Sequence, residues 1–304
     1  MKRIAAIVLF AVATMSAFAQ GTAMDFIRAD RNPATLGLAG AGSASFSVGT
    51  AFTAFGNPAL VPLSEHSYDF AGVFGVAPSG DSHSTLYGGG ASARFGGFGV
   101  SAAYLGGKYP EIPLYSEGGG ASGHATPKDM MTALGLSFAI GENLSFGAVG
   151  RYATSALDAK TTLTSISADI MALYRRDALS VTAGVVSLGP KVKSVSNRTY
   201  PLPASAKVAA AYKMGFGDLS TEVMADVDYY FSGNLGAALG VQGSYKDMAF
   251  LRLGGRLATA KEDFNVAPVP SMFTVGAGVK LFGVVFDAAY VIGGPVMAGL
   301  GYRF

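Results

Sequence analysis

The chain has 304 residues, of which 50% are hydrophobic, only 14% are charged and 42 are glycine, and it contains neither cysteine nor tryptophan. An average soluble domain has about 25% charged residues and about 7% glycine. This composition excludes a disordered chain, a disulfide scaffold and a cysteine-based zinc site. The mean hydropathy of +0.37 is typical of a membrane protein. Beyond the N-terminus, however, no run of 18 or more apolar residues could form a spanning helix.

Residues 1–19 have the features of a cleavable secretory signal peptide. Lys2 and Arg3 precede an apolar stretch over residues 4–15, and Ala17-Phe18-Ala19 forms a small-x-small cleavage site. Without those two basic residues, the 20 remaining lysines and arginines equal the 20 acidic residues in number. The sequence therefore predicts an exported protein with no net charge and no nucleic-acid partner.

Residues 20–66 are rich in glycine and alanine and show no strand periodicity. The segment includes the glycine-rich stretch from Gly37 to Gly42 and the motif Gly56-Asn57-Pro58-Ala59. It is too apolar for a free tail, so we expect it to form a hatch, or plug, inside the remainder of the chain.

Residues 67–304 alternate between apolar and small or polar side chains. At the C-terminus, for example, Leu300, Tyr302 and Phe304 alternate with Gly301 and Arg303. A period of two places each set on one face of a β-sheet. We count fourteen such segments: 67–76, 84–95, 98–105, 130–140, 144–154, 161–174, 179–188, 204–214, 219–230, 235–245, 248–259, 271–281, 284–291 and 296–304.

The connections between these segments fall into two classes. After every second strand only two to four residues intervene, as at 96–97 and 282–283, whereas long connections at 106–129, 189–203 and 260–270 follow the other strands. Short turns at one rim and longer loops at the other are typical of outer-membrane barrels. The predicted fold is therefore all-β: a 14-stranded antiparallel transmembrane β-barrel over residues 67–304, with residues 20–66 as its hatch. An unfilled barrel of this size would enclose a cavity.

Aromatic residues on the predicted outer face support a membrane location. They form one band near the short turns and a second band near the loops, where a ring can lie between the lipid and the aqueous layer. The first band comprises Phe95, Phe98, Phe138, Phe146, Tyr212, Phe286, Tyr302 and Phe304, and the second comprises Tyr87, Tyr104, Tyr152 and Tyr290.

Charged residues of both signs fall on the predicted inner face. The acidic residues of segment 219–230 and the basic residues of segment 248–259 face each other across one strand, so we expect ion pairs between them. A polar permeation path is the alternative, but mutual pairing that fixes the hatch is favoured, since buried charges need partners. The predicted lumen charge network is Arg94, Arg151, Asp169, Glu222, Asp226, Asp228, Arg252 and Arg256, with Lys207, Lys280, Asp287 and Arg303 on the same face.

The N-terminal sequence resembles a known family. Phe26-Ile27-Arg28, the Gly37–Gly42 turn and Asn57-Pro58-Ala59, ahead of fourteen strands, are similar to the PorV/PorQ proteins of Bacteroidetes-type bacteria, within the FadL-like superfamily of outer-membrane barrels. The resemblance implies a hatch in the lumen. For the PorV branch it also implies a shuttle that binds cargo proteins of the type IX secretion system.

Two functions remain open at this point. The first is a non-enzymatic binding or accessory component of protein secretion in a Gram-negative outer membrane, with secreted cargo proteins or other secretion subunits as partners. The alternative is a FadL-like transporter of hydrophobic small molecules, captured by the longest loop. We expect the surrounding outer-membrane lipid as a partner in both cases. No catalytic motif, metal-ligand spacing or cofactor fingerprint is present, so no cofactor is expected. The candidate loop contacts are Tyr109, Ile112, Leu114 and Tyr115.

Overall fold

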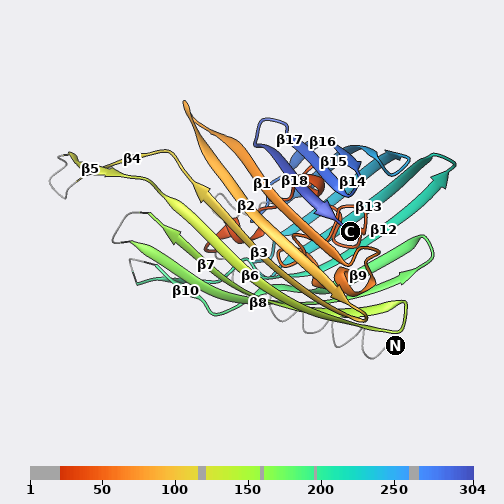
Figure 1. Cartoon of the computed structure of the whole chain (residues 1–304). Helices are drawn as coiled ribbons and strands as arrows, with labels where there is room; N and C mark the ends of the chain where they lie inside the picture. Colours follow the sequence, from red (N-terminus) through yellow and green to blue (C-terminus); the bar gives the residue numbers. More distant parts are fainter. Residues whose placement is uncertain (1–20, 116–120, 158–160, 195–196, 260–266) are drawn as a thin grey trace.

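The computed structural model describes residues 21–115, 121–157, 161–194, 197–259 and 267–304. The predicted signal peptide, residues 1–19, lies outside the described residues. The chain forms a closed antiparallel barrel of fourteen strands (Figure 1). These are β1 (Tyr68–Ser79), β2 (Ser82–Phe95), β3 (Phe98–Lys108), β6 (Lys128–Ile140), β7 (Leu144–Ala156), β8 (Thr162–Arg176), β9 (Leu179–Leu188), β12 (Ser205–Phe216), β13 (Leu219–Tyr230), β14 (Leu235–Tyr245), β15 (Ala249–Ala258), β16 (Met272–Leu281), β17 (Val284–Val291) and β18 (Val296–Arg303).

Each barrel strand pairs with its neighbours along the chain, and β18 pairs with β1 to close the ring. The closing register runs from Asp69 opposite Arg303 to Val76 opposite Val296. The predicted fold of fourteen antiparallel strands is confirmed. Closure removes the unpaired edges that an open sheet would expose in lipid.

The two rims differ as the connection lengths predicted. β2 and β3 are joined by residues 96–97 and β16 and β17 by residues 282–283, whereas β3 and β6 are separated by residues 109–127. Two small hairpins occupy the predicted loops: β4 (Ile112–Tyr115) with β5 (Ala121–Ala125), and β10 (Val192–Lys193) with β11 (Thr199–Tyr200). The sequence did not reveal them because strands of two to five residues are too short for a periodic signal.

Alternating side chains separate the two faces of the wall. On β15, Leu251 and Leu253 are 72% and 64% exposed, whereas the intervening Arg252 is 2% exposed. The arginine is shielded because it points into the barrel. The same alternation places the predicted aromatic residues on the outside, with Phe98 the most exposed of them at 69%. The barrel thus has an apolar outer face and a polar inner face.

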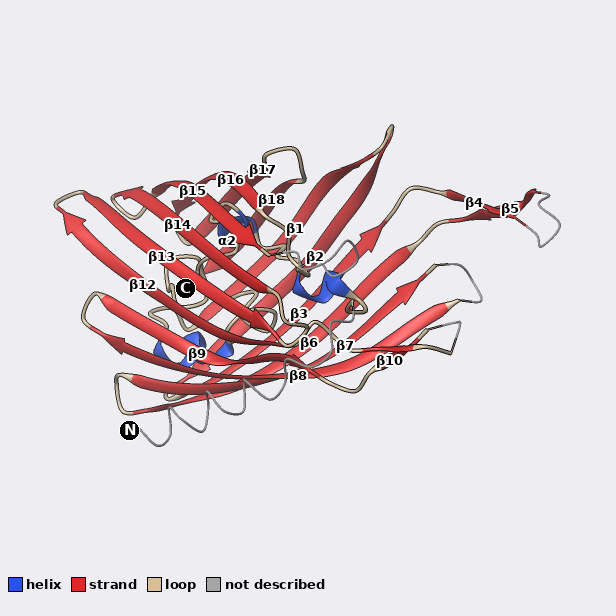
Figure 2. Cartoon of the chain, turned by 180° about the vertical axis from the view of Figure 1, so that it is seen from behind, coloured by secondary structure: helices blue, strands red, loops and turns tan. Residues whose placement is uncertain are grey.

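The N-terminal segment, residues 21–66, lies within the ring of strands (Figure 2). It contains three short helices: η1 (Asp25–Arg28), α2 (Pro33–Leu36) and η2 (Pro58–Leu63). Among the described residues, no helix is both long and apolar enough to cross a bilayer.

Inward-facing glycines leave room for this segment. A Cβ atom on Gly147 of β7 would lie 2.7 Å from the backbone nitrogen of Ala59, and one on Gly276 of β16 would lie 3.0 Å from the Cα of Gly37. A Cβ on Gly254 of β15 would overlap the backbone of Leu38. Part of the unusual glycine content is therefore explained by close approach of two backbones. The domain division at residue 67 stays a prediction.

Candidate functional site

The motif at residues 56–59 forms a capped turn buried in the barrel. The Asn57 side-chain oxygen accepts a hydrogen bond from the Ala59 backbone nitrogen at 3.0 Å, which caps η2, and Pro58 occupies the first helical position. The Asn57 amide nitrogen donates to the Ser43 carbonyl at 2.8 Å and to the Thr182 hydroxyl of β9 at 3.0 Å. Asn57 thus joins two parts of the N-terminal segment to the wall.

A second Asn-Pro-Ala turn occurs at residues 32–34. The Asn32 side-chain oxygen accepts from the Ala34 backbone nitrogen at 3.2 Å, and Pro33 begins α2. This copy was not among the predicted hatch residues, although repetition of the tripeptide was a visible signal. Its tertiary position, beside the same cavity as the first turn, became apparent only from the fold.

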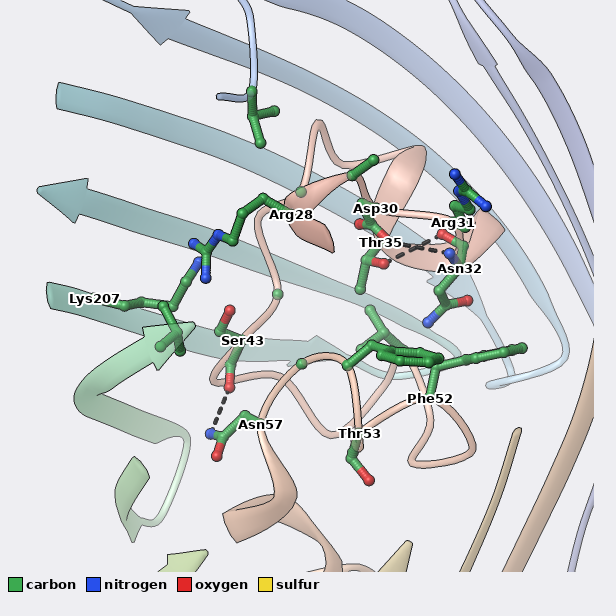
Figure 3. A pocket seen from close by; sticks show the side chains of 18 of the residues that line it. Arg28, Asp30, Arg31, Asn32, Thr35, Ser43, Phe52, Thr53, Asn57 and Lys207 are labelled. Carbon is green, nitrogen blue, oxygen red and sulfur yellow. Dashed lines mark hydrogen bonds between the residues drawn. The ribbon is translucent and has the colours of Figure 1, made fainter. Parts of the chain in front are cut away.

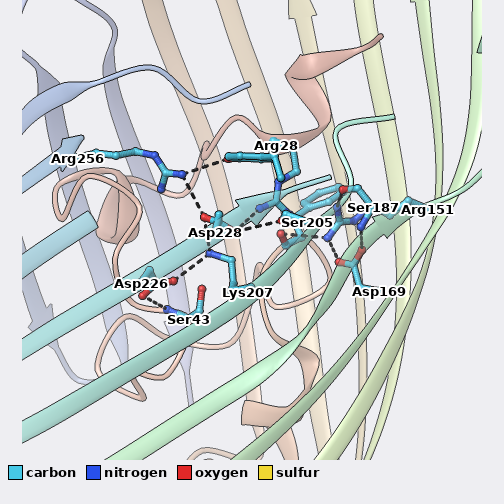
Figure 4. A network of polar contacts seen from close by, with 12 residues as sticks. Arg28, Ser43, Arg151, Asp169, Ser187, Ser205, Lys207, Asp226, Asp228 and Arg256 are labelled. Carbon is cyan, nitrogen blue, oxygen red and sulfur yellow. Dashed lines mark hydrogen bonds and ion pairs between the residues drawn. The ribbon is translucent and has the colours of Figure 1, made fainter. Parts of the chain in front are cut away.

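Asp228 is the centre of the inner charge network (Figure 4). Its carboxylate oxygens lie 2.7 Å from an Arg28 nitrogen, 3.1 Å from an Arg256 nitrogen and 3.3 Å from the Lys207 nitrogen. Asp228 is 1% exposed. The predicted pairing across one intervening strand therefore occurs between β13 and β15, and Arg28 adds the N-terminal segment to it.

Asp226, two residues earlier, continues this network toward the Gly37–Gly42 turn. It pairs with Lys207 at 3.1 Å and accepts a hydrogen bond from the Gly42 backbone nitrogen at 2.9 Å. One carboxylate therefore bonds both the strand β12 and the backbone of the N-terminal segment.

The other predicted network residues are distributed around the lumen. Arg151 pairs with Asp169, whose second oxygen accepts from the Ser187 backbone nitrogen at 2.7 Å. The β8–β9 register shifts at this point, so that Val186 and Ser187 of β9 lie opposite Asp169. Arg252 pairs with Asp287 at 2.5 Å.

Two predicted members stand apart from the Asp228 cluster. Glu222 accepts a hydrogen bond from the Ser47 hydroxyl. Arg94 is on the inner face of β2, but no carboxylate of the described residues lies within 4 Å of it. The sequence could place both side chains on the correct face, but it could not define their partners.

A cavity of about 130 Å³ lies between the N-terminal segment and the wall (Figure 3). Both Asn-Pro-Ala turns contribute to it through Asn32 and Asn57. Five cationic side chains line it: Arg28, Arg31, Arg151, Lys207 and Arg256. The apolar lining comprises Ile27, Ala29, Val48, Phe52, Phe55, Leu60, Leu105, Val186, Val269 and Met272.

Asp30 is a carboxylate on the cavity wall outside the ion-pair network. It accepts a hydrogen bond from the Asn32 backbone nitrogen at 3.0 Å and lies beside the Thr35 hydroxyl. Burial removes water from the carboxylate and raises the pKa of Asp30 to about 6, although both hydrogen bonds and Lys207 act in the opposite direction. Asp30 therefore gains a proton at mildly acidic pH.

The predicted loop contacts lie on β4 and just before it. The Tyr109 hydroxyl donates to Asp129 at 2.6 Å, and burial together with this carboxylate raises the pKa of Tyr109 to about 12. Ile112 is 36% exposed and Leu114 is partly buried on β4. Tyr115 ends that strand, and its side chain lies outside what the structure describes.

A second, apolar depression of about 1210 Å³ lies over the outer face of the barrel from β17 through β1 to β8. Small residues such as Gly72, Gly89 and Ala102 line it together with Phe70 and Tyr302. Because this depression is open, it offers apolar surface without enclosure. No group of three or more potential metal ligands occurs in the described parts of the chain.

No protein-family model matches the chain, and no curated protein is similar to it in sequence. Several solved structures share its fold. The toluene transporter TodX of Pseudomonas putida has a TM-score of 0.62 at 11% identity, covering 90% of this chain and 99% of that chain. The monoaromatic hydrocarbon channel CymD has a TM-score of 0.62 at 12% identity, with 90% and 96% covered.

A FadL homologue of Pseudomonas aeruginosa has a TM-score of 0.51 at 12% identity, with 93% of this chain and 97% of that chain covered. At such identities the likeness establishes a common fold. The FadL-like part of the predicted resemblance agrees with these structures. Its PorV/PorQ part, the type IX secretion role and the Bacteroidetes-type host have no support among them and stay predictions.

Proposed function

We propose that the protein is a non-enzymatic channel for small hydrophobic compounds in the outer membrane of a Gram-negative bacterium. The observation that carries this proposal is the cavity between the N-terminal segment and the wall, with Phe52 and Leu105 among its apolar lining. Its volume of about 130 Å³ is close to that of engineered cavities of roughly 150 Å³ that bind benzene.

The location of this cavity suits a channel. It lies inside a closed barrel whose outer face is apolar, so a compound held there is screened from lipid by one layer of strands. The solved structures of similar fold include proteins named for toluene and monoaromatic hydrocarbon transport. These likenesses favour the transporter over the secretion component that the sequence put first.

In this proposal the N-terminal segment acts as the hatch. It is fixed by the Asp228 cluster at one wall and by the glycine-lined contacts of residues 58–61 at another. Compounds reach the cavity from the loop rim, where residues of the segment and Val269 of the β15–β16 connection line it.

Uptake by intact cells tests the proposal. Cells of a Gram-negative host that produce the full chain are expected to take up radiolabelled toluene several times faster than cells with an empty vector. Leu105→Trp fills part of the cavity and should reduce the initial rate. The matched control is Leu251→Trp, the same change at a side chain that is 72% exposed on the outer face.

The amount of folded protein in each strain is measured by its gel mobility before and after heating. Equal uptake with the wild-type chain and the empty vector, for toluene and for a charged aromatic compound such as benzoate, at normal amounts of folded protein, would contradict the proposed function. Equal uptake with the two tryptophan variants would contradict the role of the cavity.

A further inference from the structure

The cavity has an excess of positive charge along its wall. Five cationic side chains line it, but only two carboxylates, Asp30 and Asp228, do so. Two further carboxylates, Asp169 and Asp226, pair with lining residues from outside the cavity. Because a buried charge is costly without a partner, the fifth cation is unusual.

Arg31 is that fifth cation. It is 5% exposed, donates a hydrogen bond to the Gly106 carbonyl at 2.8 Å and lies beside the Tyr109 hydroxyl. Within the described ranges no carboxylate oxygen lies within 4 Å of the guanidinium. Asp129, the acid of this neighbourhood, is hydrogen-bonded to Tyr109 instead. A guanidinium has five N–H donors, so most of those of Arg31 are available to a ligand.

A neutral donor and an apolar surface lie on the same cavity. The amide nitrogen of Asn32 makes no hydrogen bond within the described residues, because only its oxygen is used to cap α2. Leu105 precedes the carbonyl that holds Arg31 and also lines the cavity, as does Phe52. The cavity therefore combines an unpaired cation with apolar side chains, in a volume suited to one six-membered ring.

We propose that this cavity selects a small amphipathic monoanion, an aryl or short alkyl carboxylate, over a neutral hydrocarbon. Arg31 binds the carboxylate, and Phe52 and Leu105 contact the apolar part. This inference rests on the proposed channel function and narrows its substrate class. A carboxylate suits the planar guanidinium because two parallel hydrogen bonds can form between them.

Calorimetric titration of the purified full-length protein in detergent tests the inference. The probes are benzoate and benzamide, which have nearly the same shape and differ in charge at pH 7. Benzoate is expected to bind at least about tenfold more tightly than benzamide, as a charge-assisted hydrogen bond in a buried site implies. Equal affinities would overturn the inference, and this comparison needs no variant.

Arg31→Gln removes the charge and retains a hydrogen-bond donor. It should weaken benzoate binding at least about tenfold and change benzamide binding little. Arg31→Lys keeps the charge and should recover part of the benzoate affinity. The matched control is Arg94→Gln, which removes an inner-face arginine that does not line the cavity and pairs with no carboxylate of the described residues. It should leave benzoate binding unchanged.

The outcomes separate this inference from the function on which it rests. If cells take up toluene but benzoate shows no preference over benzamide, the channel stands and the anion selectivity is wrong. If neither probe binds and neither toluene nor benzoate uptake exceeds the empty vector, the channel function itself fails. If a variant lacks the folded gel mobility, the test uses the comparison of benzoate and benzamide binding to the wild-type protein.

Discussion

Two parts of the N-terminal segment are held by the barrel in physically different ways. The two ends of residues 28–43 are held by charge, since Arg28 pairs with Asp228 and the Gly42 nitrogen donates to Asp226, although Gly37 and Leu38 between them lie against wall glycines. Residues 58–61 are held by shape: they lie against inward-facing glycines such as Gly147.

The difference shows two ways to fix a plug inside a barrel. Ion pairs specify a position through direction and charge, but each buried charge depends on its partner. Contacts with wall glycines fix the N-terminal segment through close packing of two backbones. They are possible only because the glycine has no side chain. The glycine-based attachment also includes one directional interaction, a hydrogen bond from the Ser145 hydroxyl to the Ala59 carbonyl at 2.5 Å.

The largest effect should come from breaking the charged attachment. Asp228→Asn leaves Arg28, Lys207 and Arg256 with one carboxylate fewer in a buried site. We expect a loss of about 3–5 kcal/mol in the free energy of unfolding, the usual cost of a broken buried pair. The measurement is the fraction of protein with folded gel mobility as a function of temperature.

The control for this change lies on the same strand hairpin. Asp218 pairs with Lys246 at 3.5 Å, and both side chains are about half exposed or more. Asp218→Asn should therefore alter the unfolding temperature little, because exposed pairs contribute little. Similar losses in the two variants would show that Asp228 has no special role.

A smaller effect should follow from obstructing the shape-based attachment. In Gly147→Val the new Cβ would lie 2.7 Å from the Ala59 nitrogen and from Pro58. We expect a loss of about 1–3 kcal/mol, as for overpacked cores, and faster protease cleavage within residues 50–66. Gly243→Val is the control, since a Cβ at Gly243 meets nothing within 4 Å. Unchanged cleavage in Gly147→Val would contradict the glycine contacts.

The smallest effect concerns Asp30, which belongs to neither attachment. Its pKa of about 6 in the folded protein lies above the ordinary value of 3.8. The folded state therefore binds the proton more tightly, and this contribution to stability is present below pH 3.8 and lost as pH rises through about 6. Asp30→Asn should stabilise the protein at pH 7 by on the order of 1 kcal/mol and have less effect at pH 4.

Thermal unfolding of the wild type and Asp30→Asn at pH 4, 5, 6 and 7 measures this dependence. The gap between the two unfolding temperatures should widen as the pH rises. A gap that stays constant across this range would show that Asp30 titrates normally. Asp81→Asn, at the exposed turn between β1 and β2, controls for loss of a carboxylate.

The barrel could be predicted from the strand pattern alone. Alternation of apolar and small residues assigns each side chain to one face, because a strand has a period of two. It also placed Arg256 and Asp228 on inner faces one strand apart, although the registers align Arg256 with Asp226, so that its pairing with Asp228 is diagonal. The lengths of the connections then predicted that one rim has short turns and the other has long loops.

The residues that form the cavity could be identified only from the folded chain. Arg31, Asn32 and Phe52 lie in a segment without periodicity, so no local pattern indicates their directions. Their positions depend on where the glycines of distant strands admit a backbone and where Asp226 and Asp228 accept hydrogen bonds. The face on which a strand residue lies follows from the residues next to it in the sequence. The cavity instead depends on contacts between residues as far apart in the sequence as Arg28 and Asp228.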